Sequence, residues 1–326
     1  MGEKIRWGIV GPGNIARSFA NDLKLVEDGE LTAVASRSLQ RAKEFADEYG
    51  AEHSFGSYEE LFESDVVDVL YIATPHTSHC TLTIEAMDYG KNVLCEKPMG
   101  VNADEVKMMM AAAKKNGVFL MEALWSRFNP SITMAKQLIA NGEIGEVAYL
   151  NANFGFYALD RDENGRLLNP DLAGGSLLDI GIYPIFLAYL MLGKPDNIEA
   201  GSLFYKTGVE VQTSMIFEYA KAQAVLASGL RSKISMKAEI AGSKGAIYLP
   251  ERWHEAQGYI IERDGTEEKF DMPTTGKGYS HEIDEVHDCL RNGKLQSDKW
   301  TLQNSLDLVN LLDEVRDISG VTFPFE

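Results

Sequence analysis

The sequence predicts an α/β protein in which a doubly wound parallel sheet is followed by a second domain with a large, open, mostly antiparallel sheet. Strand-like and helix-like segments alternate through the first third of the chain, and a glycine-rich turn joins the first strand to the first helix. Longer strand-like segments then succeed one another. Because this change follows Glu122, and because 326 residues suffice for two domains, we expect domains over residues 1–122 and 123–326.

In the first domain, short apolar runs that suit buried strands alternate with amphipathic stretches that suit helices. This βαβ rhythm is typical of a parallel sheet, because parallel strands need a long crossover between them. The expected strands span residues 5–10, 31–35, 66–73, 93–95 and 118–121. The expected helices span residues 15–25, 40–49, 79–89 and 103–116.

In the second domain, a helix over residues 131–140 precedes strand-like segments joined by short turns, which predicts antiparallel pairing. Pro184 suits the first turn of a helix, so we expect a helix from Tyr183 to Leu192. Helices over residues 282–291 and 301–318 follow the sheet. The expected strands span residues 147–156, 198–205, 209–219, 223–231 and 237–240.

Lys and Arg number 31 and Asp and Glu number 49, so the formal net charge is −18. Nucleic acid and anionic membranes repel such a surface, and no uninterrupted apolar run approaches the roughly 18 residues of a membrane span, so we expect neither partner. Cys80, Cys95 and Cys289 lack disulfide or zinc spacing, which suits a reducing cytoplasm. No cysteine or carboxylate cluster accompanies His76 and His79, so we expect no metal site.

The turn after the first strand has the pattern G-x-G-x-x-A, formed by Gly11, Gly13 and Ala16. Small residues there allow a tight turn, a close approach of the backbone to a pyrophosphate, and close packing of helix on strand. The helix N-terminus faces the anion. Because the pattern lies between a strand and a helix, it predicts a dinucleotide site rather than an ordinary turn. The expected contacts are Gly11, Pro12, Gly13, Asn14 and Ile15.

The end of the second strand indicates which dinucleotide is bound. NAD-preferring sites usually carry an acidic residue there, which accepts a hydrogen bond from the ribose 2′-hydroxyl. This strand ends in Ala35, Ser36 and Arg37, without a carboxylate. Ser36 can donate a hydrogen bond to a 2′-phosphate, and the planar guanidinium of Arg37 can pair with it. We therefore expect NADP in preference to NAD.

A charged triplet, Glu96-Lys97-Pro98, follows the expected strand over residues 93–95, at the sheet edge where such folds bind ligands. The proline restricts the turn and the glutamate supplies an opposite charge, so the lysine can be held in one orientation. A lysine held there can exchange a proton with a substrate hydroxyl. By itself, the triplet can also be interpreted as a solvated turn.

Four motifs occur in order along the chain: Gly11-Pro12-Gly13, Thr74-Pro75-His76-Thr77-Ser78-His79, Cys95-Glu96-Lys97-Pro98 and Gly174-Gly175-Ser176-Leu177-Leu178-Asp179-Ile180-Gly181-Ile182-Tyr183. Together they resemble the glucose-fructose oxidoreductase and inositol dehydrogenase (Gfo/Idh/MocA) family. The resemblance implies an N-terminal Rossmann domain that binds NAD(P), and a C-terminal α/β domain that binds substrate and supports oligomerisation. It also implies hydride transfer between the cofactor and a secondary alcohol or lactol of a sugar or polyol.

By this resemblance, Lys97 matches a lysine assigned to proton transfer or to polarising the reacting oxygen, and Asp179 matches an acidic residue of the substrate pocket. Many inositol-dehydrogenase-like members have His four positions after that acid, where this chain has Tyr183. In having Tyr183 there, and in residues 121–128, the chain resembles the branch that contains dimeric dihydrodiol dehydrogenase and NADP-dependent D-xylose dehydrogenase. Whether Lys97 or Tyr183 carries the proton stays open. The resemblance implies these further cofactor contacts: Thr74, Pro75, His76, His79, Glu96, Lys97, Trp125 and Arg127.

The sequence thus predicts a cytoplasmic, NADP-dependent oxidoreductase that acts on a sugar or on a cyclic or vicinal diol, of the D-xylose or trans-dihydrodiol type. One alternative is a sugar-sugar oxidoreductase or redox-assisted glycosidase that keeps its cofactor bound. Another is a non-catalytic sensor of NADP(H), although Lys97, Asp179 and Tyr183 argue against it, because a sensor needs no proton transfer. The open sheet is expected to support a homodimer or a higher homo-oligomer, because its uncovered face would expose apolar area in a monomer.

Overall fold

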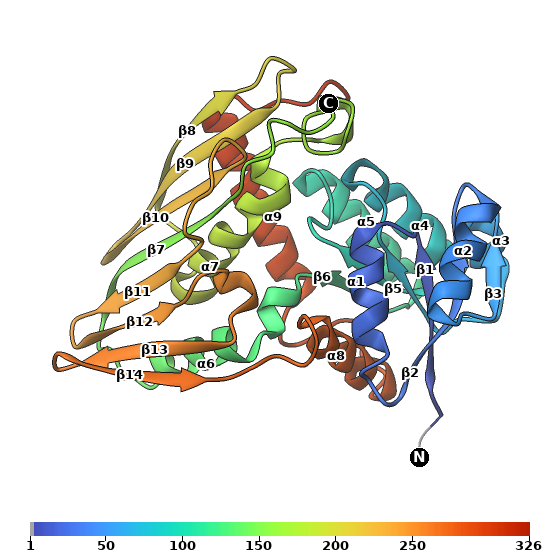
Figure 1. Ribbon diagram of the computed structural model, residues 1–326, viewed down its shortest axis with the longest axis horizontal. Coiled ribbons are helices and arrows are strands. Elements are labelled where there is room, and N and C mark those ends of the chain that lie inside the picture. The colour runs from blue at the N-terminus through green and yellow to red at the C-terminus, as the bar shows by residue number, and fades with distance from the viewer. Residues whose placement is uncertain (1–2) are drawn as a thin grey trace. The chain divides into compact units, whose positions relative to one another are not determined.

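The computed structural model describes residues 3–326 and divides the chain into two compact units (Figure 1). Unit 1 combines Met1–Trp125 with Thr275–Leu306, and unit 2 combines Ser126–Thr274 with Asp307–Glu326. The first stretch of unit 1 ends close to the boundary expected after residue 122. The structure differs from that expectation in the segment Thr275–Leu306, which returns to unit 1 instead of staying with the second domain.

Unit 1 is built on a six-stranded parallel sheet with the strand order β3-β2-β1-β4-β5-β6. Strands β2 and β3 follow β1 on one side of it, whereas β4, β5 and β6 follow on the other side, so the strand order reverses between β1 and β4. In doubly wound folds, ligands bind at such a point, beside the carboxyl ends of the strands. This confirms the predicted parallel sheet. The strands are β1 (Ile5–Val10), β2 (Gly29–Ala35), β3 (His53–Phe55), β4 (Val69–Ile72), β5 (Asn92–Glu96) and β6 (Leu120–Ala123).

The helices of unit 1 begin and end where the sequence carries caps. Ser38 and Asn102 accept hydrogen bonds from backbone N–H groups in the first turns of α2 and α5, and Gly50 and Gly117 end these helices in the left-handed conformation. The helices are α1 (Asn14–Leu23), α2 (Leu39–Tyr49), α3 (Tyr58–Glu63), α4 (His79–Asp88), α5 (Ala103–Asn116) and α8 (Tyr279–Arg291).

Helix α8 joins unit 1 through a buried carboxylate on α1. The side chain of Asp22 accepts hydrogen bonds from the backbone N–H groups of Lys277, Gly278 and Tyr279, at the start of α8. The ring of His287 on α8 accepts a 2.9 Å hydrogen bond from the Trp7 indole on β1. These contacts explain why Thr275–Leu306 belongs to unit 1, although it lies far from α1 and β1 in sequence.

Unit 2 contains an eight-stranded sheet with the order β14-β13-β12-β11-β7-β10-β9-β8. Strands β7 and β10 pair in parallel, and every other neighbouring pair is antiparallel, which confirms the predicted mostly antiparallel sheet. The strands are β7 (Val147–Gly155), β8 (Asn197–Phe204), β9 (Glu210–Tyr219), β10 (Ala222–Gly229), β11 (Ala238–Gly242), β12 (Gly245–Leu249), β13 (Gly258–Arg263) and β14 (Thr266–Asp271).

Helices cover one face of this sheet. Helix α6 (Pro130–Ala140) contacts β12 and β13, helix α7 (Ile182–Leu192) contacts β7 and β10, and both lie on the same side of the sheet in Figure 1. The division between the units falls within α9 (Leu302–Ser319). On the other face, paired strands expose large apolar side chains: Tyr149, Leu203, Ile216 and Val225.

Among the described residues, the segment Pro170–Leu192 is long and apolar enough to cross a membrane by length and composition. In its most apolar window 78% of the residues are buried, and the segment includes α7, which packs on the sheet of unit 2. These observations identify it as a core segment of the fold.

Candidate active site

The turn between β1 and α1 is open on the side where an anion would approach. Gly11 has a φ of +90°, and a Cβ built on it would stand 2.9 Å from the Thr74 side chain and 3.1 Å from the carbonyl oxygen of Ala73. A larger residue would therefore both strain the backbone and collide with the loop that follows β4. A Cβ on Gly13, by contrast, meets no heavy atom within 4 Å.

The N-terminus of α1 can interact with a pyrophosphate. Gly13 provides the N-cap of α1 without a side chain to occupy the backbone N–H groups, and the first turn carries no acidic residue. The hydroxyl oxygen of Thr74 is buried without a hydrogen-bond partner at the neighbouring strand end. An open turn, a helix N-terminus and an unpaired hydroxyl together fit a dinucleotide.

The end of β2 carries the residues expected at the ribose. Ser36 is buried, and its hydroxyl accepts a 3.3 Å hydrogen bond from the backbone N–H of Ser38. Arg37 is exposed, and no carboxylate of residues 3–326 pairs with it. A cationic side chain is thus present where NAD sites usually have an acid.

His79 connects the loop after β4 with the turn that carries Lys97. Its ring is fully buried, with Nδ1 2.8 Å from the carbonyl oxygen of Pro98 and Nε2 2.9 Å from that of Thr74. Burial lowers the pKa of His79, and the two carbonyl contacts oppose this shift. His76 lies against the His79 ring, with the ring centroids 5.7 Å apart. Because both nitrogens of His79 contact backbone, this side chain holds the two loops together.

Lys97 follows β5 in a turn that buried glutamates hold from two sides. The Lys97 side chain is partly enclosed, with the residue 9% exposed. Glu96 accepts hydrogen bonds from the backbone N–H of Lys97, at 3.1 Å, and from the Tyr71 hydroxyl. Glu122 accepts a 3.0 Å hydrogen bond from the backbone N–H of Met99.

Glu122 is itself fixed by the C-terminal part of unit 1. The Trp300 indole donates a 3.1 Å hydrogen bond to its second carboxylate oxygen. Burial raises the pKa of Glu122, and these hydrogen bonds act in the opposite direction. The roles of Tyr71, Glu122 and Trp300 were missed by the sequence reasoning, because no local pattern marks their contacts with the Lys97 turn.

In unit 2, Asp179 lies on a π-helical turn, Leu177–Gly181, that leads directly into α7. The residue is 7% exposed, and its carboxylate oxygen is 2.8 Å from a guanidinium nitrogen of Arg166. Arg166 lies on the loop between β7 and the π-helical turn, and sequence reasoning did not single it out. The structure thus places a charged pair at the position of the predicted substrate-orienting acid.

Tyr183 lies in the first turn of α7, as predicted, and packs against an aromatic pair. Its ring centroid is 5.3 Å from that of Phe154 and 5.4 Å from that of His254, and the latter two rings stack at 4.2 Å. Asp179 and Tyr183 therefore lie on consecutive turns of one segment, and Tyr183 belongs to a buried aromatic cluster. Phe154 and His254 come from distant parts of the sequence and were not predicted.

The two remaining expected cofactor contacts fall on either side of the division between the units. Trp125 ends the first stretch of unit 1 and stacks on Tyr279, with ring centroids 4.9 Å apart. Arg127 belongs to unit 2 and is buried. Contacts of these residues with a cofactor stay predictions. Within residues 3–326, no cluster of three or more His, Cys, Asp or Glu side chains could hold a metal ion.

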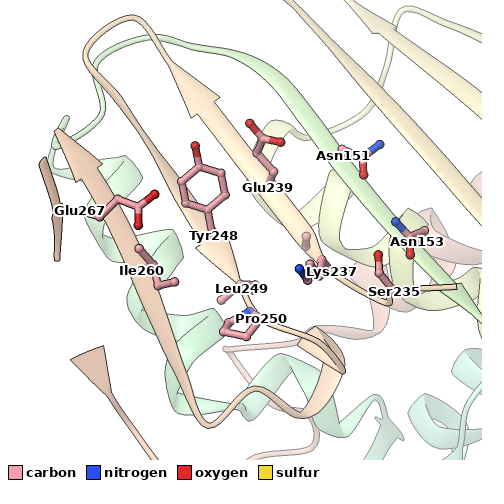
Figure 2. Close-up of a pocket in the computed structure, with 11 residues that line it drawn as sticks. Asn151, Asn153, Ser235, Lys237, Glu239, Tyr248, Leu249, Pro250, Ile260 and Glu267 are labelled. Atoms are coloured by element: carbon pink, nitrogen blue, oxygen red, sulfur yellow. The ribbon is translucent and has the colours of Figure 1, made fainter. Parts of the chain in front are cut away.

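A cavity of about 340 Å³ lies on the sheet of unit 2 (Figure 2). The cross-strand row Asn151, Glu239, Tyr248 and Ile260 contributes to its lining, and these residues alternate with buried neighbours along their strands. The cavity therefore opens on the more exposed face of the sheet. It contains none of the predicted catalytic or cofactor residues, so it is distinct from the candidate active site.

Two family models match the chain. The Gfo/Idh/MocA model, described as an oxidoreductase family with an NAD-binding Rossmann fold, matches residues 5–124. The model of the Gfo/Idh/MocA C-terminal domain matches residues 132–248. Both parts of the chain are thus similar to parts of one enzyme family, in the same order.

Individual relatives are similar over nearly the whole chain. The trans-1,2-dihydrobenzene-1,2-diol dehydrogenases of Mus musculus and Homo sapiens are 37% and 35% identical, each with 98% of both chains covered. The structure of a 3-ketoreductase from Actinomadura kijaniata, in complex with NADP and TDP-benzene, has a TM-score of 0.87 at 28% identity and covers 97% of this chain and 98% of that chain. An aldose-aldose oxidoreductase from Caulobacter crescentus shares the fold, with a TM-score of 0.89 at 24% identity over 98% of both chains.

Proposed function

The chain belongs to the Gfo/Idh/MocA family of NAD(P)-dependent oxidoreductases, and from this premise we propose that it oxidises a cyclic or vicinal diol, or a sugar, with NADP. The observation that carries the proposal is the Lys97 turn. It lies at the carboxyl end of β5 in a Rossmann sheet and is held by Glu96, Glu122 and His79. A buried network of this kind suits a residue whose orientation matters for a reaction.

The preference for NADP is supported by the end of β2. An exposed guanidinium at Arg37 and a hydroxyl at Ser36 stand where NAD-preferring sites present a carboxylate. Gly11, Gly13 and Thr74 would hold the pyrophosphate side of the cofactor. The similar 3-ketoreductase structure contains NADP, which agrees with this proposal.

In the proposed mechanism, Lys97 or Tyr183 accepts the proton of the substrate hydroxyl. Asp179, whose charge is balanced by Arg166, accepts hydrogen bonds from the neighbouring hydroxyl and so orients the diol. NADP, when bound, would supply the acceptor for the hydride from the carbinol carbon. The partial burial of Lys97 and Tyr183 limits the access of water to the proton acceptor.

We propose a cyclic trans-diol as the first substrate to examine. The buried aromatic cluster of Phe154, His254 and Tyr183 gives this part of unit 2 apolar surroundings that suit an unsaturated ring, and the dehydrogenases named above act on a cyclic diol. A sugar of the D-xylose type is the second candidate, because the Asp179 carboxylate can bind any pair of hydroxyl groups.

The direct test is a panel of trans-dihydrodiols, pentoses, hexoses and inositols with NADP and with NAD, followed by absorbance at 340 nm. We expect reduction of NADP with at least one diol or sugar, and slower reduction of NAD. Failure of the whole panel would count against the dehydrogenase. Purified protein that absorbs at 340 nm, and turns over sugars without added cofactor, would instead support a sugar-sugar oxidoreductase or a redox-assisted glycosidase.

We also propose that the chain acts in the cytoplasm as a homodimer or larger homo-oligomer. The support for self-association is the exposed face of the unit 2 sheet, where the exposed side chains of Ile216 and Val225 lie directly opposite each other on β9 and β10. Contiguous apolar surface of this kind is stabilised when a second copy covers it.

A further inference from the structure

A buried carboxylate bonds to the turn that carries Asp179. Glu210, the first residue of β9, is 1% exposed. The backbone N–H of Leu177 donates a hydrogen bond to its Oε1, and the Ser176 hydroxyl donates to its Oε2 over 2.8 Å. The Thr213 hydroxyl donates to Oε2 at 3.4 Å. Glu210 therefore ties the start of the π-helical turn to the sheet of unit 2.

The backbone next to this carboxylate allows a close approach. Gly175 has a φ of +122°, and a Cβ built on it would stand 2.6 Å from Glu210 Oε1. A side chain there would displace the carboxylate or open the turn. The Ser176 hydroxyl is also 2.9 Å from that of Ser228 on β10, so the same segment is bonded to two neighbouring strands.

Packing alone does not explain a carboxylate at this position. Burial of a charged group costs free energy unless hydrogen bonds compensate, whereas an apolar side chain would fill the space without that cost. Burial raises the pKa of Glu210 to about 7, and the hydrogen bonds from Leu177, Ser176 and Thr213 oppose the shift. Of those three donors, Leu177 is the first residue of the turn and Ser176 is its N-cap, so the bonding capacity of this group is used mainly to hold the start of the turn.

Both predicted substrate residues of unit 2 depend on the turn. Asp179 is its middle residue, and Tyr183 follows in the first turn of α7. Such π-helical turns are frequent at functional sites. The other ionisable groups here are Asp179 itself, which pairs with Arg166, and Tyr183, which packs on aromatic rings. Among these groups, Glu210 is the one that bonds the backbone of the turn.

We propose that Glu210 is a positioning residue, which holds the π-helical turn so that Asp179 and Tyr183 keep the orientation that the substrate requires. The inference rests on the proposed function, because Asp179 and Tyr183 are the groups proposed to meet the substrate. Glu210 acts through them. Its loss should therefore impair substrate binding and turnover and leave cofactor binding unchanged.

The test uses Glu210→Gln, which keeps the side-chain volume but replaces one acceptor oxygen with a donor. We expect kcat/KM to fall about 10- to 100-fold, with a raised KM, because small displacements of reacting groups have effects of this size. The Kd for NADPH should stay the same. Amide hydrogen exchange in residues 176–183 should become about 10-fold faster or more. Glu218→Gln, on the same strand, is the matched control and should change none of these values.

Hydrogen exchange separates this inference from the proposed function, because it needs no substrate. Unchanged exchange in residues 176–183, or equally faster exchange throughout the chain, would overturn the positioning role. An active wild-type enzyme with unchanged kcat/KM in Glu210→Gln would overturn it as well. Wild-type protein without turnover would count against the proposed function alone. If Glu210→Gln does not fold, Ser176→Ala removes one donor and should give the same pattern at smaller amplitude.

Discussion

At the residue scale, Lys97 is the group on which the proposed chemistry depends most. We expect Lys97→Ala to lower kcat by about 10²- to 10⁴-fold, the usual contribution of a positioned acid or base, while NADPH binds as before. Turnover followed at 340 nm and NADPH binding followed by fluorescence measure the two effects. Lys114→Ala, on the exposed face of α5, is the control and should behave as wild type.

The same assay distinguishes the two candidate proton acceptors. If Lys97→Ala retains full activity while Tyr183→Phe is inactive, the proton passes to the phenol, and the assignment to Lys97 is wrong. If both variants are inactive, the two groups act as one unit, as catalytic residues often do.

The proposed preference for NADP over NAD assigns the cofactor choice to Arg37. We expect Arg37→Ala to raise the Kd for NADP by about 10- to 100-fold, because a charge-assisted hydrogen bond contributes about 1.5–3 kcal/mol, and to leave the Kd for NAD nearly unchanged. Titration calorimetry with both cofactors measures this difference. Arg41→Ala, one turn into α2, serves as the control. An equal loss of affinity for both cofactors would show that Arg37 does not contact the 2′-phosphate.

The buried carboxyl group of Glu210 should make stability depend on pH. Its pKa is raised to about 7 in the folded state, above the ordinary value of 4.5, so the folded state binds its proton more tightly than the unfolded state does. The contribution of Glu210 to the free energy of unfolding is therefore largest at acidic pH and is lost as the pH rises through 7. When urea unfolding is measured between pH 5 and pH 8, the free energy of unfolding should decrease less with rising pH for Glu210→Gln than for wild type. Equal slopes would contradict this prediction.

Several positioning contacts could not be predicted from the sequence, because the two residues of each contact are distant along the chain. Glu122 and Trp300, and likewise Leu177 and Glu210, meet only when the fold is complete. The sequence identified Lys97 and Asp179 through short motifs whose spacing is local. A single sequence carries no signal for which distant carboxylate holds such a motif in place.

At the element scale, helix α8 is attached to unit 1 mainly through its N-terminus. We expect Asp22→Ala to lower the free energy of unfolding by about 1–3 kcal/mol, because three backbone N–H groups lose a buried acceptor. Chemical denaturation followed by circular dichroism measures the change. Asp47→Ala, exposed on α2, should stay close to wild type. A similar loss in both variants would show that the cap is not responsible.

Most elements could be predicted because their apolar periodicity is strong. The bounds of β1 and α5 agree with the prediction, and those of α2, α6 and β9 differ by one residue at the start. The missed elements fall into two groups. Strand β3 and helix α3 are short, so little periodicity accumulates in them. Strand β12 is only five residues long, and β13 ends in two charged residues. Strand β14 carries three acidic residues and a lysine and is exposed along its whole length, so the hydrophobic pattern that marks a strand is weak there.

At the scale of the whole molecule, the exposed sheet of unit 2 predicts self-association. We expect light scattering after size exclusion to give at least twice the chain mass of 36.1 kDa. Val225→Glu should shift the protein to the monomer mass, because it places a charge within the apolar face. Leu25→Glu, an exposed apolar position in unit 1, is the control. A wild-type protein that stays at 36.1 kDa at high concentration would contradict the dimer.

The sequence by itself determined the fold class, and it pointed to the glycine-rich turn as the expected phosphate site and to the candidate residues Lys97, Asp179 and Tyr183. These features depend on periodicity and on short motifs, which neighbouring residues encode. Only the tertiary structure decided that Thr275–Leu306 returns to unit 1, and that His79, Glu122 and Glu210 hold the loops around the candidate residues. Such contacts join residues far apart in sequence. They are decided by the burial of polar groups that must find hydrogen-bond partners in the completed fold.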